Sequence, residues 1–186
     1  MKRAIDIILC ILCIVVLSIP FFVIVSLVFI SSRGEVLHWS RRIGKDNREY
    51  FMPKIRTMQL GAPNVATHLL KTPKKYLTSM GPFLRRTSLD EIPQVWSILK
   101  GDMSFVGPRP ALYNQYDLIK LRTNHGVHKL LPGLTGLAQI SGRDDLPISK
   151  KVEKDILYLK KQSIFFDFKI ILLTFRNIVF GKDISH

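Results

Sequence analysis

An uncharged apolar segment near the start of the chain constrains this protein more than any other feature. Residues 7–30 form a run of 24 residues without a charged side chain. As one α-helix they would extend over about 36 Å, enough to cross the hydrocarbon core of a bilayer. A cleaved signal peptide has a shorter apolar core and a small-x-small cleavage site, which residues 31–35 do not supply. We therefore predict a membrane-embedded segment over residues 1–33 and a globular domain over residues 34–186.

Basic residues stand at both ends of this apolar segment. Lys2 and Arg3 precede it and Arg33 follows it, although positive charges normally mark the cytoplasmic end of a single span. Pro20, near the middle, lacks a backbone donor and bends a helix, and Ser18 can hydrogen-bond a carbonyl near the bend. A re-entrant helical hairpin with both ends in the cytoplasm accounts for the charges and the proline together. The alternative is an ordinary kinked span.

The charge balance indicates anionic partners. The chain has 28 lysines and arginines against 14 acidic residues, a formal net charge of +14. Such a charge suits nucleic acid, phospholipid or a phosphorylated substrate. The 47% apolar content excludes a disordered tail. Both cysteines, Cys10 and Cys13, lie in the apolar segment, which excludes a secreted fold held together by disulfides.

The rest of the chain is long enough for one compact domain. Mixed apolar and basic runs on either side of a turn at residues 44–47 predict a β-hairpin or short strands within residues 35–58. Helical patterns follow, and the first has a capping box of Ser88 and Glu91 at its start and Gly101 as its C-cap. We expect an α+β fold, in which the membrane hairpin precedes a small, mostly helical domain with short strands and amphipathic interfacial helices. The predicted helices cover residues 88–100, 111–122, 148–162 and 164–180.

The last predicted helix, residues 164–180, is strongly apolar but carries Asp167, Lys169 and Arg176. These charges make it a poor transmembrane span. A helix in the headgroup layer, with its aromatic side chains towards the lipid and its charges towards water, fits the pattern better. A buried core helix is the alternative.

Asp90 and Glu91 form an adjacent acidic pair at the predicted start of a helix. The helix dipole and the free N–H groups favour negative charge there, so a structural role alone would explain the pair. Its neighbours favour a functional role, because Arg85 and Arg86 precede it and Arg109 lies in a proline-rich loop. Adjacent helical side chains point about 100° apart, so one carboxylate can act as a nucleophile while the other binds a cation.

Further basic residues are candidates for binding phosphate. Arg109 stands between two prolines, and a guanidinium on so rigid a backbone suits bidentate capture of a phosphate. Arg143 follows a Ser-Gly pair, where the glycine lets the backbone approach a ligand. Lys54 and Arg56 would lie on one face of a strand. Each of these residues is also typical of a turn or of a solvated strand edge.

Three long motifs stand in order in the middle of the chain: RRTSLDEIPQ at residues 85–94, LKGDMS at residues 99–104 and VGPRP at residues 106–110. Together they resemble the bacterial sugar transferase family, the monotopic polyprenyl-phosphate phosphoglycosyl transferases. The short chain is similar to the minimal catalytic form of that family. Shorter matches extend the resemblance over nearly the whole chain, at residues 2–6, 42–45, 54–58, 132–136 and 138–143.

The resemblance implies transfer of a sugar-1-phosphate from a nucleoside diphosphate sugar, expected to be UDP-linked, to undecaprenyl or another polyprenyl phosphate. A nucleoside monophosphate leaves, and the product initiates an O-antigen, capsule, exopolysaccharide or glycoprotein glycan. In the family the reaction requires Mg²⁺ and forms a phosphosugar on the aspartate of the acidic pair. Asp90 is thus the expected nucleophile and Glu91 the expected Mg²⁺ ligand. The expected substrate and phosphate ligands are Lys54, Arg56, Arg85, Arg86, Arg109 and Arg143.

The resemblance also implies a re-entrant helix, with its break at Ser18 and Pro20. It places the protein in the bacterial inner (cytoplasmic) membrane with the active site on the cytoplasmic face, in contact with anionic lipids; a homodimer is left open. A membrane-tethered nucleic-acid binder is less well supported, because the basic residues are scattered and lack an aromatic stacking platform. A catalytically inactive scaffold of a glycan assembly complex is the other alternative, although Asp90, Glu91 and Arg109 are all present.

Overall fold

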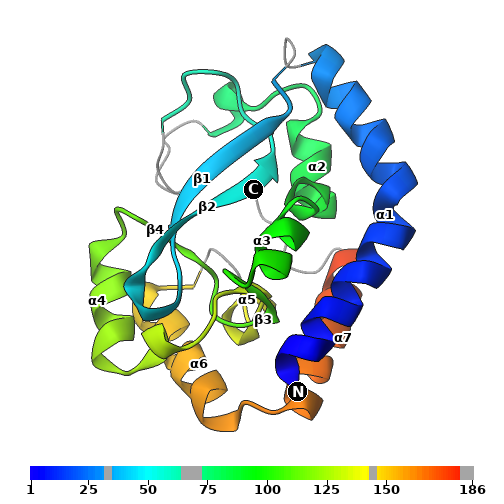
Figure 1. The fold of residues 1–186 in the computed structure, drawn as a ribbon. Helices are drawn as coiled ribbons and strands as arrows, with labels where there is room; N and C mark the ends of the chain where they lie inside the picture. Colours follow the sequence, from blue (N-terminus) through cyan, green and yellow to red (C-terminus); the bar gives the residue numbers. More distant parts are fainter. Residues whose placement is uncertain (32–34, 64–72, 143–145, 181–186) are drawn as a thin grey trace.

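The computed structural model describes residues 1–31, 35–63, 73–142 and 146–180, and they form an α+β fold (Figure 1). The helices are α1 (Lys2–Ser31), α2 (Gly81–Thr87), α3 (Gln94–Lys100), α4 (Tyr116–Asn124), α5 (Leu137–Ile140), α6 (Ile148–Lys161) and α7 (Ile164–Phe180). The strands are β1 (Leu37–Ile43), β2 (Glu49–Ile55), β3 (Ser104–Val106), β4 (Ala111–Leu112) and β5 (Gly133–Thr135). Short 3-10 helices are η1 (Lys45–Asn47), η3 (Pro73–Tyr76), η4 (Leu89–Glu91) and η5 (Val127–Lys129).

Strands β1 and β2 form the predicted hairpin. They pair antiparallel, with Ile43 opposite Glu49 beside the turn. In that turn Asp46 and Asn47 have φ angles of 55° and 58°, a left-handed conformation that Asp and Asn tolerate better than most residues. Strand β4 pairs with the other edge of β1, so the order in this sheet is β2-β1-β4. The hairpin brings β2 against η4, which carries the acidic pair.

Strands β3 and β5 pair in parallel. The loop at residues 107–110 begins directly after β3, so this pairing fixes the position of its first residue. Gly107 and Gly133 approach each other closely at this point. A Cβ atom on Gly133 would lie 2.1 Å from the backbone nitrogen of Gly107. Only glycine leaves room for so close an approach of two backbones, so both glycines are needed where β3 runs into this loop.

The main apolar core joins the first half of α1 to the globular domain. Cys10, Ile98, Met103, Tyr158 and Ile170 are each at most 1% exposed in this core. Burial of an apolar side chain of this size stabilises a fold by about 1.5–3 kcal/mol. The first half of α1 is therefore part of the folded domain rather than a tether to it.

The second half of α1 contacts the domain at a separate place. Ile24 and Val28 pack against Ile55 and Leu84 in a second apolar cluster. Figure 1 shows α1 as one helix that changes direction part-way along its length and lies beside the domain. Its composition and length suit a membrane helix. Apolar side chains between the two contacts are exposed, among them Ile11, Leu12, Val15, Ile19 and Phe22.

Pro20 lies inside α1, so the helix continues through the predicted break. The Ser18 hydroxyl donates to the carbonyl oxygen of Val15 at 3.0 Å, next to the Val16 carbonyl that an N–H at position 20 would bond in a regular helix. The structure thus contains one bent helix at this position. The re-entrant path through a membrane stays a prediction.

Two details of the predicted helices are wrong. Ser88 does not cap a helix, because its backbone is left-handed (φ 56°) and its side chain makes no capping hydrogen bond. Pro93 has no N–H for an α-helical bond, so residues 89–91 form a 3-10 turn and α3 starts only at Gln94. The next helix begins at Tyr116 rather than at residue 111, because β4 pairs with β1 there.

The two C-terminal helices agree with the predicted ranges. Figure 1 shows α7 beside the first half of α1. Asp167, Ile170 and Asn177 on one side of α7 are buried. The other side of the helix exposes a row of large apolar side chains, which fits the predicted interfacial helix better than a core helix. This apolar face of α7 consists of Phe165, Phe168, Leu172, Phe175, Val179 and Phe180.

Candidate active site

The acidic pair lies in η4, between the left-handed Ser88 and the first turn of α3. Asp90 is only 8% exposed, and Glu91 is partly buried. The short 3-10 turn presents both carboxylates to Lys54 on β2, and it presents Glu91 also to Arg109 in the loop at residues 107–110. Two adjacent acids in a largely buried position require such partners, because burying an unpaired carboxylate is costly.

Lys54 bridges the two carboxylates from β2. Its Nζ atom lies 2.7 Å from Glu91 Oε1 and 3.9 Å from Asp90 Oδ2. The lysine side chain is 16% exposed, so water screens these interactions only partly. Lys54, one of the phosphate-binding candidates, thus lies within 4 Å of both carboxylates.

Arg109 contacts Glu91 from the loop at residues 107–110. Its Nη1 atom lies 3.5 Å from Glu91 Oε1, and its side chain is 40% exposed. Arg109 thus contacts the acidic pair and is also accessible to solvent. A side chain that binds an anionic ligand needs this access. Glu91 Oε1 thus has two cationic groups within 4 Å, Lys54 Nζ and Arg109 Nη1.

Burial raises the pKa of the Asp90 carboxyl above its usual range, and the adjacent Glu91 adds to this effect. Lys54 opposes it most strongly, followed by Arg85 and Arg109. The basic side chains are thus what favours the ionised form of Asp90, which is the form that a carboxylate nucleophile needs.

The remaining candidates lie at different distances from the pair. Arg85 donates to the hydroxyl of Thr57 at 3.0 Å and is close enough to affect the pKa of Asp90. Arg86 is exposed on α2. Arg56 forms an ion pair with Glu35 and donates to the carbonyl of Leu37, so its contacts lie outside the acidic pair. Arg143 lies outside the described residues.

Sequence reasoning missed the residues that hold the Arg109 loop in place. Arg122 donates to the carbonyl oxygen of Arg109 at 2.8 Å, and Arg42 donates to that of Pro110 at 3.1 Å. Two prolines in a short loop do signal that its carbonyls need partners from elsewhere. Nothing local in the sequence identifies residues 42 and 122 as those partners.

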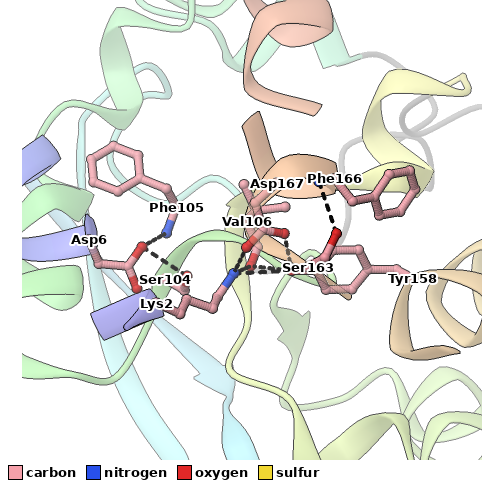
Figure 2. Close-up of polar contacts among 9 residues, drawn as sticks. All are labelled: Lys2, Asp6, Ser104, Phe105, Val106, Tyr158, Ser163, Phe166 and Asp167. Carbon is pink, nitrogen blue, oxygen red and sulfur yellow. Dashed lines mark hydrogen bonds and ion pairs between the residues drawn. The ribbon is translucent and has the colours of Figure 1, made fainter. Parts of the chain in front are cut away.

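Lys2 supplies a third such contact from the start of α1 (Figure 2). Its Nζ atom donates to the carbonyl oxygen of Val106 at 3.0 Å and to the Tyr158 hydroxyl at 3.1 Å. Lys2 also forms an ion pair with Asp167, which accepts a 2.6 Å hydrogen bond from Tyr158. The first turn of α1 is thereby bound to α6, to α7 and to the end of β3.

The donor set at the acidic pair suits one kind of metal ion. The described residues contain no group of three or more His, Cys, Asp or Glu side chains arranged to hold a metal. Mg²⁺ commonly takes only one or two protein carboxylates and completes its shell with substrate phosphates and water. Glu91 and Asp90 therefore fit Mg²⁺ bound together with a phosphorylated substrate.

Comparison with known proteins yields a consistent set of relatives. The sequence profile of bacterial sugar transferases matches residues 1–181. The exopolysaccharide production protein ExoY of Sinorhizobium fredii is 34% identical over 196 residues, which cover 97% of this chain and 86% of that protein. UDP-glucose:undecaprenyl-phosphate glucose-1-phosphate transferase of Escherichia coli is 38% identical over 182 residues, 94% of this chain and 39% of the relative.

A third relative is the UDP-galactose-lipid carrier transferase of Erwinia amylovora, which is 32% identical over 200 residues. That match covers 98% of this chain and 41% of the relative. The chain thus spans most of the Sinorhizobium protein and about two-fifths of the Escherichia and Erwinia proteins.

Proposed function

Because the chain belongs to the bacterial sugar transferase family, we propose that it is a phosphoglycosyl transferase. It transfers a sugar-1-phosphate from a UDP-linked sugar to polyprenyl phosphate and releases the nucleoside monophosphate. The observation that carries this proposal is the buried Asp90 beside Glu91, with Lys54 and Arg109 within 4 Å of the pair. The names of the relatives, which include UDP-sugar and undecaprenyl-phosphate transferases, support the same reaction.

Asp90 attacks the phosphorus that bears the sugar. The bond between its carboxylate oxygen and that phosphorus forms as the bond to the bridging diphosphate oxygen breaks, and the nucleoside monophosphate leaves. The phosphate oxygen of the polyprenyl acceptor then displaces Asp90 from the same phosphorus, which restores the carboxylate. A short side chain in a fixed turn suits this in-line attack, because the aspartate has few rotamers to lose.

Lys54 and Arg109 stabilise the negative charge that develops on the phosphoryl oxygens. Lys54 lies close to both carboxylates, so it also counters their mutual repulsion. Arg109 has the solvent access and the planar donor fork that a diphosphate requires. Arg85 adds positive charge from α2, and Arg143 stays a candidate for contact with the donor.

Glu91 would hold Mg²⁺, together with phosphate oxygens of the donor. When bound, this ion would neutralise the diphosphate and assist departure of the nucleoside monophosphate. The Glu91 side chain is more exposed than that of Asp90, at 17% against 11%, which supports this division of roles. Asp90 stays available as the nucleophile.

We also propose that α1 enters and leaves the membrane on the same side. A straight helix of 30 residues would be about 45 Å long and would place its ends on opposite sides of a hydrocarbon core of about 30 Å. Yet Lys2 contacts Val106 at one end, and Val28 packs with Leu84 towards the other. Both ends of α1 therefore contact the same folded domain. If α1 spanned the bilayer, parts of this domain would have to lie on opposite sides of it. A re-entrant path, bent near Pro20, avoids this conflict.

The globular domain then lies on the cytoplasmic face of the bacterial inner membrane. The apolar face of α7 and the exposed middle of α1 enter the lipid, and neighbouring lysines and arginines contact anionic headgroups. The exposure of Phe165 and Phe175, at 90% and 68%, supports this placement. Leu89 and Ile92, on either side of the acidic pair, pack against the apolar cluster that contains Ile24 and Val28 of α1. This places the pair close to the membrane helix, where a polyprenyl phosphate would present its headgroup.

One assay tests the reaction. Purified protein is incubated with Mg²⁺, polyprenyl phosphate and a panel of nucleotide sugars, and the released nucleoside monophosphate is measured. We expect release with at least one UDP-sugar and none with the Asp90→Asn variant. Absence of release with every donor, or equal release by Asp90→Asn, would contradict the proposal. Salt-sensitive DNA binding without turnover would support a nucleic-acid binder instead.

A further inference from the structure

The loop that carries Arg109 depends on side chains from distant parts of the chain. Pro108 and Pro110 have no N–H groups, and the loop carbonyls are bonded from outside. The backbone nitrogen of Gly133 donates to the Pro108 carbonyl at 2.9 Å. Arg122 donates to the carbonyl of Arg109 itself at 2.8 Å. Arg122 is therefore bonded directly to the backbone of the residue that faces the acidic pair.

Arg122 is itself fixed by Asp155. Its Nε and Nη2 atoms donate to Asp155 Oδ2 at 2.9 Å and 2.7 Å, while Nη1 points to the Arg109 carbonyl. The two residues lie on facing helices, Arg122 on α4 and Asp155 on α6. Arg122 is 9% exposed and Asp155 is 1% exposed. One planar guanidinium thus spans a buried carboxylate and the loop, with little freedom to move.

A buried ion pair needs an explanation beyond stability. Removing two charges from water costs free energy, and apolar side chains of similar volume often stabilise a protein as well or better. Burial also raises the pKa of Asp155, and the nearby Arg122 lowers it. The attraction between the two charges is therefore offset by the cost of removing the carboxylate from water. An apolar pair between α4 and α6 would pack the two helices together, but it would not hold the carbonyl of Arg109.

We propose that Arg122, oriented by Asp155, is a positioning residue that sets the place of Arg109 opposite Glu91. This inference rests on the proposed function, because it assigns Arg109 to the donor diphosphate. Arg122 touches the backbone of Arg109 and acts through it. Its loss leaves the chemistry of the acidic pair unchanged but lets the Arg109 loop drift away from the ligand.

Two changes separate positioning from stability. The double variant Arg122→Met with Asp155→Leu replaces the ion pair by apolar side chains and keeps helix packing. Arg122→Lys keeps a charge beside Asp155 but loses the fork that reaches both partners. The matched control is Glu153→Gln on the same helix α6, which breaks an exposed 2.8 Å ion pair with Lys150. All variants are also made in an Arg109→Ala background.

Three experiments are carried out on each full-length protein in detergent. They measure the midpoint of thermal unfolding, kcat and KM for the UDP-sugar, and hydrogen exchange of the loop amides at residues 107–112. For the double variant we expect a midpoint near that of the wild type, a loss of about 10- to 100-fold in kcat/KM, and faster exchange in the loop. Arg122→Lys should lose activity in the same direction, and Glu153→Gln should match the wild type in all three measurements.

The Arg109→Ala background gives the sharpest comparison. If Arg122 acts through Arg109, adding the double variant to Arg109→Ala should lower kcat/KM by less than about twofold. The reason is that the two losses are not independent. Full additivity there, or wild-type activity and loop exchange in the double variant, would overturn the proposal. A wild-type protein that releases no monophosphate would refute the proposed function instead, while loop exchange would still decide whether the pair holds the loop.

Discussion

Lys2 Nζ donates to the carbonyl oxygen of Val106 at 3.0 Å, across 104 positions of sequence. This contact joins the first turn of the apolar helix to the strand that runs into the Arg109 loop. Arg3 reinforces it by donating to the carbonyls of Ile98 and Leu99 at the end of α3. The start of α1 is therefore bound to the domain that carries the acidic pair. Any path of α1 through a membrane must keep Lys2 and Arg3 on the same side as that domain.

The first prediction concerns this path. Single cysteines replace the exposed Ala4 and the exposed Lys45 in a chain without Cys10 and Cys13. Both should be labelled by a membrane-impermeant thiol reagent only after the cells are permeabilised, because both face the cytoplasm. Labelling of the Ala4 cysteine in intact cells would contradict the re-entrant path.

Pro20→Leu provides the matching perturbation. Leucine restores the backbone donor and removes the ring that bends the helix. We expect part of the population to adopt a straight span, in which Ala4 is labelled from the periplasm. The conservative change Ile19→Leu, one position earlier, should leave the labelling pattern as it is. The same pattern in Pro20→Leu would show that the proline does not determine the path.

The second prediction concerns the role of Arg109. Arg109→Lys keeps the charge but loses the planar donor fork, so we expect kcat/KM for the UDP-sugar to fall by about 30- to 1,000-fold. This range corresponds to roughly 2–4 kcal/mol of transition-state stabilisation. Steady-state kinetics measures it, with the exposed Arg41→Lys as the control. Near-normal kinetics in Arg109→Lys would mean that this arginine serves only the turn.

The third prediction concerns stability below neutral pH. Partial burial lowers the pKa of His38, and Arg56, Arg42 and Lys54 lower it further. The unfolded chain therefore binds the proton more readily than the folded chain. Stability from this group is fully present above the ordinary histidine pKa of about 6.5, and it is lost as the pH falls from that value through the lowered pKa of the folded chain.

Thermal unfolding at pH 7.5 and pH 5.5 measures this effect. The midpoint should fall less in His38→Asn than in the wild type between these two pH values. His38 is exposed on β1 and solvent screens its imidazole, so the difference should amount to a few degrees at most. Leu37→Val, beside His38 on β1, changes no titratable group and should behave as the wild type does. Identical curves for the wild type and His38→Asn would contradict the prediction.

The fourth prediction concerns the cation. Removal of divalent ions with a chelator should abolish monophosphate release, and added Mg²⁺ should restore it. Glu91→Gln should raise the Mg²⁺ concentration needed for half-maximal rate and slow both half-reactions, because one carboxylate ligand is lost. The titration of rate against Mg²⁺ measures this shift. A Glu91→Gln enzyme with the wild-type Mg²⁺ requirement would remove Glu91 from the metal site.

Local patterns in the sequence predict much of this fold. The C-terminal helices are long and periodic, the hairpin has clear turn residues at Asp46 and Asn47, and Gly101 ends α3 with φ 94°. The capping box at Ser88 fails because Pro93, two residues beyond Glu91, prevents the expected helical bonds. Residues 111–112 form a strand because β1 offers a free edge, which no local pattern reveals.

The site was predictable to the extent that its residues are neighbours in sequence. Asp90, Glu91 and Arg109 stand in recognisable motifs, and the structure brings them together with Lys54. The pair of Arg122 and Asp155 has no local signal, because its partners are 33 residues apart and meet only when α4 packs on α6. Long-range contacts of this kind emerge from tertiary packing alone.

The fifth prediction tests the central claim that Asp90 is the nucleophile. Lys54 lies 3.9 Å from Asp90 and 2.7 Å from Glu91, so either carboxylate has a cation beside it, and only one should carry the phosphosugar. Intact-mass spectrometry of protein mixed with Mg²⁺ and the UDP-sugar, without acceptor, measures this directly. We expect a mass increase equal to one sugar phosphate in the wild type, a slower increase in Glu91→Gln and none in Asp90→Asn. An adduct that persists in Asp90→Asn would contradict the assignment.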